Sequence, residues 1–338
     1  MRKNLSYLLF ILYTSLFSAC ENEIPFQSKI QEPQLLMNAF LEAEKEENQV
    51  YLHIIDSETT TLVSDGAVTI YVNGEKKEVA EAELISTSYN DSTKYCRVKT
   101  QFLPGDLVRL EAAAENGQYH AWAEVKIPQP IEKIIQVDTL LTKIKIGYYM
   151  DNCIRYRITF NDRSGEKNYY QLRIQENTYR TYPEEGTTYG PAIIYPDIIS
   201  QEDIVLTDGH LSTADDEEFG ILDMTVQNVN NVFTDSRFEN GSYTLNVYTR
   251  YYDHKNMDEK LFVETDAVIR LLCITQTDYR YMRAMNCLES GNYNETFMEP
   301  VIVPQNVSGG LGFVGASSEQ QVTLRMVDRP PLLAPKNK

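Results

Sequence analysis

The chain has 338 residues, of which 42% are hydrophobic and 24% are charged, and this composition is typical of a globular protein with a sizeable core. Its formal charge of -18 argues against a nucleic-acid-binding protein, which needs a basic surface to neutralise phosphates. The same charge argues against a protein that lies flat on anionic lipid headgroups, and the length predicts about two domains.

Residues 1–19 are predicted to be a lipoprotein signal peptide. A short basic segment precedes an apolar run that is too short, and too often interrupted by polar residues, to span a membrane. The small residues Ser18 and Ala19 then stand directly before Cys20, as in a bacterial lipobox. We therefore expect Cys20 to be acylated and to become the first residue of the mature chain. The alternative at this point is an ordinary secretory peptide that ends near a cysteine.

The next segment, residues 20–34, is predicted to be an acidic tether. It is polar and contains two prolines, which favours an extended linker between a lipid anchor and a folded domain. Glu21 and Glu23 permit two interpretations, an acidic surface-export tag or a plain charged linker.

Residues 35–128 are predicted to form an immunoglobulin-like β-sandwich. Apolar and polar residues alternate in several short segments, which is the pattern of half-buried antiparallel strands. Asn73-Gly74 predicts a tight hairpin and Pro104-Gly105 a turn, and Pro128 and Pro130 mark the end of the domain. The strands are expected at 49–56, 67–74, 94–102, 106–114 and 118–127. The expected core positions are Leu52, Ile54, Val68, Ile70, Val108, Leu110, Trp122 and Val125.

Residues 129–330 are predicted to form a second, β-rich domain with long loops and one clear helix, followed by a tail at 331–338. The helix is expected at 277–290, with Thr277 as its N-cap and with Tyr281, Met285 and Leu288 on one face. The turn at 161–165 is interpreted as a hairpin between two strands. The strands are expected at 134–140, 153–162, 168–176, 242–250, 267–275 and 321–327.

Residues 178–220 have little periodicity and are predicted to form long loops, which on a strand scaffold are where binding residues tend to lie. Four tyrosines of this segment form the proposed contact loop, because their rings offer flat, amphipathic area to a sugar, a peptide or a partner protein. They are Tyr179, Tyr182, Tyr189 and Tyr195. The alternative is that many of these rings belong to strand faces.

No catalytic constellation is identified, so the chain is not expected to be an enzyme, and no cofactor or metal site is predicted. The segment 309–315 contains a formal dinucleotide fingerprint, but the strand and helix that this motif requires are not expected around it. A tight chain reversal is the favoured interpretation. For Cys96, Cys153, Cys273 and Cys287, both a Cys273–Cys287 disulfide and unpaired core thiols stay open.

Two segments of the C-terminal third, 233–250 and 278–318, carry a specific motif, and 65–68 and 121–128 carry a weaker one. The residues of the main motif are Tyr279, Tyr281, Phe297, Glu299, Pro300, Asn306, Gly309 to Gly312, Phe313, Gly315 and Ala316. In these residues the chain resembles the Bacteroidota lipoprotein family catalogued as domain of unknown function 4249.

The resemblance implies a lipoprotein of the outer membrane that is anchored through Cys20 and can be exposed at the cell surface. It also implies a TonB-dependent receptor as the protein partner, and hence a non-catalytic accessory or binding role in nutrient uptake, with the ligand unknown. The alternatives are a surface enzyme that processes polysaccharide or peptide, and a structural or adhesion protein of the envelope. The implied compartment allows O-glycosylation at Thr139, within the triplet Asp138-Thr139-Leu140.

Overall fold

The computed structural model describes residues 32–56, 59–86, 92–182, 186–209, 226–251, 262–289 and 300–326. The leader, Cys20 and most of the tether lie outside these ranges. The described part of the chain is mainly β with one helix, which confirms the predicted fold class. None of its helices is long and apolar enough to cross a membrane.

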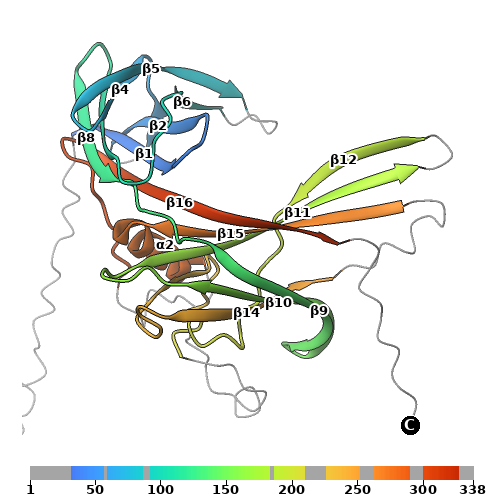
Figure 1. Cartoon of the computed structure of the whole chain (residues 1–338). Coiled ribbons are helices and arrows are strands. Elements are labelled where there is room, and N and C mark those ends of the chain that lie inside the picture. Colours follow the sequence, from blue (N-terminus) through green and yellow to red (C-terminus); the bar gives the residue numbers. More distant parts are fainter. Residues whose placement is uncertain are drawn as a thin grey trace, which may run out of the picture.

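The first part of the chain forms two facing sheets around one core (Figure 1). The long strand β5 joins them, because its first half pairs with β4 and its second half with β6. One sheet contains β1, β2, β6 and the end of β5, and the other contains the start of β5 with β4, β7 and β8. The strands are β1 (Gln34–Glu42), β2 (Asn48–Ile55), β3 (Thr60–Leu62), β4 (Gly66–Val72), β5 (Glu75–Ser86), β6 (Ser92–Val98), β7 (Leu107–Ala114) and β8 (Tyr119–Lys126).

The period-two pattern accounts for this core. Leu52, Val68, Ile70, Val108 and Leu110 are fully buried, and Val125 is nearly so, as predicted. Ile54 is partly buried and packs against the same cluster. The predicted turns at Asn73-Gly74 and Pro104-Gly105 are present, with the glycines at positive φ.

The prediction that Trp122 lies in the core is wrong. Trp122 and Val125 are three residues apart on β8, so a strand places their side chains on opposite faces. The inward face takes Ala121, Ala123 and Val125, and Trp122 is 40% exposed. The Arg109 guanidinium stacks on its indole ring, with the guanidinium carbon 4.2 Å from the ring centroid.

The second part also has two β layers. One layer contains β12, β11, β15 and the second half of β16, with β13 paired to β11, and the other is the sheet β14-β10-β9. Between them lies a core that includes Tyr156, Phe160, Tyr170 and Leu271. The strands are β9 (Ile134–Ile146), β10 (Tyr149–Asn161), β11 (Tyr169–Tyr182), β12 (Thr187–Ile194), β13 (Val232–Thr234), β14 (Ser242–Arg250), β15 (Phe262–Ile274) and β16 (Leu311–Met326).

The turn after Asn161 is not a hairpin. β10 pairs with β9 and β14, whereas β11 pairs with β12, β13 and β15, so the chain crosses here from one layer to the other. Asp162 holds this crossover: one carboxylate oxygen accepts a hydrogen bond from the hydroxyl of Tyr170, at 2.5 Å, and the other accepts one from the Asn240 backbone N–H.

The last strand, β16, belongs to both parts of the molecule. Residues 311–317 pair with β1 in parallel, and residues 317–326 pair with β15 in antiparallel fashion. In Figure 1 this strand, coloured red, runs from the upper sandwich across to the lower layers. The interpretation of 309–315 as a chain reversal is therefore wrong beyond Gly310, because Leu311 to Gly315 are extended.

The glycines of this segment allow the chain to pass close to its neighbours. A Cβ at Gly310 would overlap the backbone oxygen of Leu35, and a Cβ at Gly312 would overlap that of Met37. Gly312 also has a φ of 118°, which favours glycine. The motif thus serves the packing of β16 on β1 rather than the binding of a phosphate.

The predicted helix is present as α2 (Gln276–Glu289), but its cap and its buried face differ from the prediction. The cap is Thr275, whose hydroxyl accepts a hydrogen bond from the Asp278 N–H at 3.1 Å. Asp278, Met282 and Asn286 are buried, while Leu288 is 47% exposed. The buried face is polar in part because Asp278 and Asn286 bind backbone and side-chain groups of neighbouring segments.

Candidate functional site

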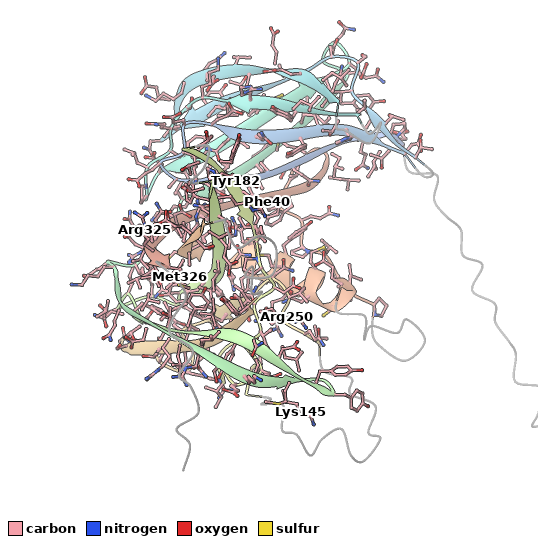
Figure 2. All side chains as sticks on the ribbon, turned by 90° about the vertical axis from the view of Figure 1, so that its right-hand side faces the viewer. Phe40, Lys145, Tyr182, Arg250, Arg325 and Met326 are labelled. Carbon is pink, nitrogen blue, oxygen red and sulfur yellow. The ribbon has the colours of Figure 1, made fainter. Side chains whose placement is uncertain are left out.

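The two layers of the second part separate at one end and enclose a cavity of about 350 Å³. Figure 2 looks toward this end, with Arg250 and Met326 lying between Tyr182 above and Lys145 below. Most of the lining is apolar or hydroxylic. It consists of Ile154, Glu176, Thr178, Ile194, Tyr195, Pro196, Asp197, Arg250, Tyr251, Val263, Thr265, Ala267 and Met326.

Glu176 occupies a core position of β11. Leu172 and Ile174 precede it on the same face of the strand and are buried in the core between the layers. Alternation therefore directs the Glu176 side chain inward, at the point where the core ends and the cavity begins. Its strand neighbours on either side are Ile194 and Ala267, which are also cavity residues.

Burial raises the pKa of the Glu176 carboxyl, and a weak hydrogen bond from Thr249 lowers it by less. The Thr249 hydroxyl lies 3.5 Å from Oε1 and is fully buried. No cationic group of the described chain forms an ion pair with Glu176, so its charge is poorly compensated. Such a carboxylate in an apolar lining is a group available to a ligand.

The hydroxyl of Tyr156 is a second polar group near Glu176, and it lacks a hydrogen-bond partner among the described residues. This side chain is fully buried, and its oxygen has no hydrogen-bond partner within the described part of the chain. Burial is the main cause that raises its pKa, and the nearby charge of Glu176 adds to the effect, while the neighbouring Thr249 side chain, which is not within hydrogen-bond geometry of the hydroxyl, lowers it by less. A buried hydroxyl without a partner destabilises the protein by about 1–3 kcal/mol.

The other charged residues of the lining lie toward the rim. The Arg250 guanidinium is paired with Asp151, with Nε 3.2 Å from Oδ2, and both side chains are more than a third exposed. Asp197 is exposed. Thr178 and Thr265 face each other across β11 and β15, with their hydroxyl oxygens 3.3 Å apart.

The four tyrosines of the predicted contact loop do not share one loop. Residues 178–182 and 187–194 form a β-hairpin, so the prediction of irregular structure is wrong for this part of 178–220. Tyr182 and Tyr189 lie on the same face of the hairpin as Glu176, and their rings form an edge contact with centroids 5.7 Å apart. Tyr195 lines the cavity, whereas Tyr179 lies on the opposite face of β11.

Thr139 lies on β9 opposite Tyr156, in the middle of a strand rather than in a loop. Its side chain is exposed, as are those of Asp138 and Leu140. The triplet is therefore accessible from solvent, and its glycosylation stays a prediction.

Other chemistry-bearing residues have structural roles. The Asp203 carboxylate accepts hydrogen bonds from the backbone N–H groups of Val205, Leu206 and Asn246, so it fixes a turn. Cys96, Cys153 and Cys273 are free and buried, and burial raises the pKa of each thiol, that of Cys96 to about 12. No group of three or more side chains able to hold a metal ion occurs in the ranges described above.

Glu176 was not predicted from the sequence as a functional residue. The signal was present, because an acid interrupts the alternating apolar positions 170, 172 and 174 of a strand. A single acid at such a position cannot be distinguished from the end of a strand without knowledge of the opposite sheet.

Comparison with known proteins supplies a family but no activity. The family model described as Domain of unknown function (DUF4249) matches residues 21–323, which is most of the chain. No curated protein matches the sequence.

Proposed function

We propose that this chain, which belongs to the family described as Domain of unknown function (DUF4249), is a lipid-anchored, non-catalytic binding protein. It acts at the outer membrane, with its anchor on Cys20 and a tether at residues 20–34. Its role is that of an accessory subunit of a TonB-dependent receptor in nutrient uptake, and its ligand occupies the cavity between the β layers.

The cavity is the observation that carries this proposal. Its volume of about 350 Å³ lies within the range of small-molecule sites, and its lining combines apolar walls with a few polar groups. Among the lining residues within the described ranges there is no histidine, cysteine or serine, and Glu176 is the only carboxylate directed inward. These groups suit binding better than acid–base or nucleophilic chemistry.

The anchoring and the partner are supported by the sequence. The leader has the order of a lipoprotein signal, and segments 233–250 and 278–318 resemble lipoproteins that accompany TonB-dependent receptors. The cell-surface location, the acidic export tag and the glycosylation of Thr139 belong to the same proposal.

Co-purification from detergent-solubilised outer membranes tests the function. Tagged protein that carries Cys20 is expected to bring down a TonB-dependent receptor, and the Cys20→Ala variant is expected to accumulate as an unlipidated precursor with less receptor. Recovery of the lipidated protein without any receptor contradicts the uptake role. Unchanged labelling of Cys20→Ala by a fatty-acid analogue contradicts the anchor.

A further inference from the structure

The charges around the cavity are the starting point. Glu176 is directed into it and Asp197 lies at its rim, while Arg250, the one cation among the lining residues that the structure describes, is already paired with Asp151. Among these described residues negative charge is therefore in excess. Thr178 and Thr265 form a hydrogen bond with each other, and no cation of the described chain pairs with Glu176.

The position of Glu176 at the inner end of the lining, where the core ends, distinguishes its charge from the charges at the rim. Among its neighbours in the lining, Ile154 and Ala267 are buried, whereas Ile194 is 51% exposed, so Glu176 is half-buried and can be reached from solvent. Burial raises the pKa of Glu176, which means that the ionised form lacks stabilisation in the empty cavity. A ligand that brings a positive charge to this depth supplies that stabilisation.

We propose that the cavity selects a small apolar amine, with its ammonium group on the Glu176 carboxylate and its apolar body between Ile154, Ile194 and Met326. This inference rests on the proposed binding function and names the ligand class for the same site. The ammonium group donates to the Glu176 carboxylate, whose Oε1 also lies 3.5 Å from the buried Thr249 hydroxyl.

Two other ligand classes fit less well. An anionic ligand would meet Glu176 at the bottom and Asp197 at the rim, with Arg250 already engaged. A sugar needs many polar partners, whereas the inner walls of the cavity are aliphatic and its two threonines already hydrogen-bond to each other.

The experiment compares hexylamine, 1-hexanol and hexanoate, which share an alkyl chain and differ in charge. Binding is measured by calorimetry at pH 7 on the mature chain from Glu21 onward, which lacks both the leader and the acylated cysteine and therefore needs no detergent. We expect hexylamine to bind about 10- to 100-fold more tightly than 1-hexanol, and hexanoate to bind most weakly.

Glu176→Gln is expected to abolish this preference and to leave the affinity for 1-hexanol unchanged. Glu264→Gln is the matched control. Glu264 lies on the outer face of β15 and is paired with Arg325, so this substitution removes the same charge outside the cavity. It is expected to keep the preference. Thermal unfolding of both variants verifies that they are folded.

Equal affinity for hexylamine and 1-hexanol overturns the inference, as does a preference that survives Glu176→Gln. Failure of all three probes to bind at millimolar concentration also overturns it. The proposed function fails separately, through the absence of a receptor in the co-purification, which makes no use of amines.

Discussion

Replacing Gly315 with alanine tests how α2 is held against β16. Gly315 has an ordinary strand conformation, so alanine is acceptable to the backbone, and the effect comes from contacts alone. An added Cβ would overlap Oδ1 of Asp278 and lie 2.8 Å from Cε1 of the Phe313 ring.

The Asp278 carboxylate has little freedom to move away. Its Oδ2 accepts hydrogen bonds from the Thr275 hydroxyl at 2.6 Å, the Thr275 N–H at 3.2 Å and the Ala316 N–H at 2.8 Å. Overpacking of this kind costs about 1–3 kcal/mol, and displacement of the acid adds about 1 kcal/mol through the lost helix cap. We therefore expect Gly315→Ala to lower the free energy of unfolding by about 2–4 kcal/mol.

A double-mutant cycle isolates the cause. In an Asp278→Ala background the carboxylate is absent, and the edge of the Phe313 ring, 2.8 Å from the new Cβ, is the close contact that remains. Gly315→Ala is then expected to cost less than about 1 kcal/mol, a coupling of at least about 1 kcal/mol between the two sites. Urea unfolding, followed by circular dichroism, measures all four proteins.

Gly66→Ala serves as the control. Its added Cβ meets the side-chain ends of Leu52 and Val63, at 3.1 and 3.2 Å, and these can move by a few tenths of an ångström; the Cβ of Ala82 lies at an ordinary contact distance of 3.5 Å. Its cost is expected to be smaller than that of Gly315→Ala. Equal costs of Gly315→Ala with and without Asp278 refute the reasoning, because the clash then lies elsewhere.

Three further predictions concern single groups. Burial raises the pKa of Asp278 to about 6 from 3.8, so the folded state holds its proton more tightly and this group's contribution to stability falls as pH rises from about 4 to about 6. At about 1.4 kcal/mol per pH unit, and with the unfolded carboxyl already half ionised at about pH 4, wild type should lose about 2 kcal/mol more than Asp278→Ala between pH 4 and pH 7, and parallel urea series at the two pH values would show it. Asn306→Ala should lower the free energy of unfolding by about 2 kcal/mol, because the Asn306 side chain donates to the Val314 carbonyl and accepts from its N–H, and denaturant midpoints measure the loss. Tyr156→Phe should raise the melting temperature, since it removes a buried hydroxyl without a partner at a gain of about 1 kcal/mol, and a lower melting temperature contradicts the assignment.

Strands with one buried face were the predictable part of the fold. β4 and β7 alternate buried and less buried residues, and their positions follow from the sequence. β1 was missed because it is a central strand between β2 and β16, with Leu35 and Met37 in the core and Phe40 packed on the other face against Tyr281 and Phe313. Apolar residues on both faces remove the alternation.

β12 was missed for the opposite reason. It is an edge strand whose residues are almost all exposed, so nothing in its pattern records burial. Its position depends on pairing with β11, which is a long-range property of the folded chain. The cavity could not be predicted from the sequence for the same reason. Its lining comes from both layers, and only the fold brings Glu176, Arg250 and Tyr195 together.

The residues that carry the family resemblance and those that line the cavity are largely separate. Asn306, Gly310, Gly312 and Phe313 hold β16 between the two parts of the molecule, and Tyr281 stacks on Phe313 with centroids 4.6 Å apart. The cavity is built mainly from 176–197 and 263–267, which lie within the family match of 21–323 but outside the motif segments 233–250 and 278–318, except for Arg250. These motif residues therefore serve the joining of the two parts. The ligand must be inferred from the cavity itself, and in this chain the inference depends on Glu176.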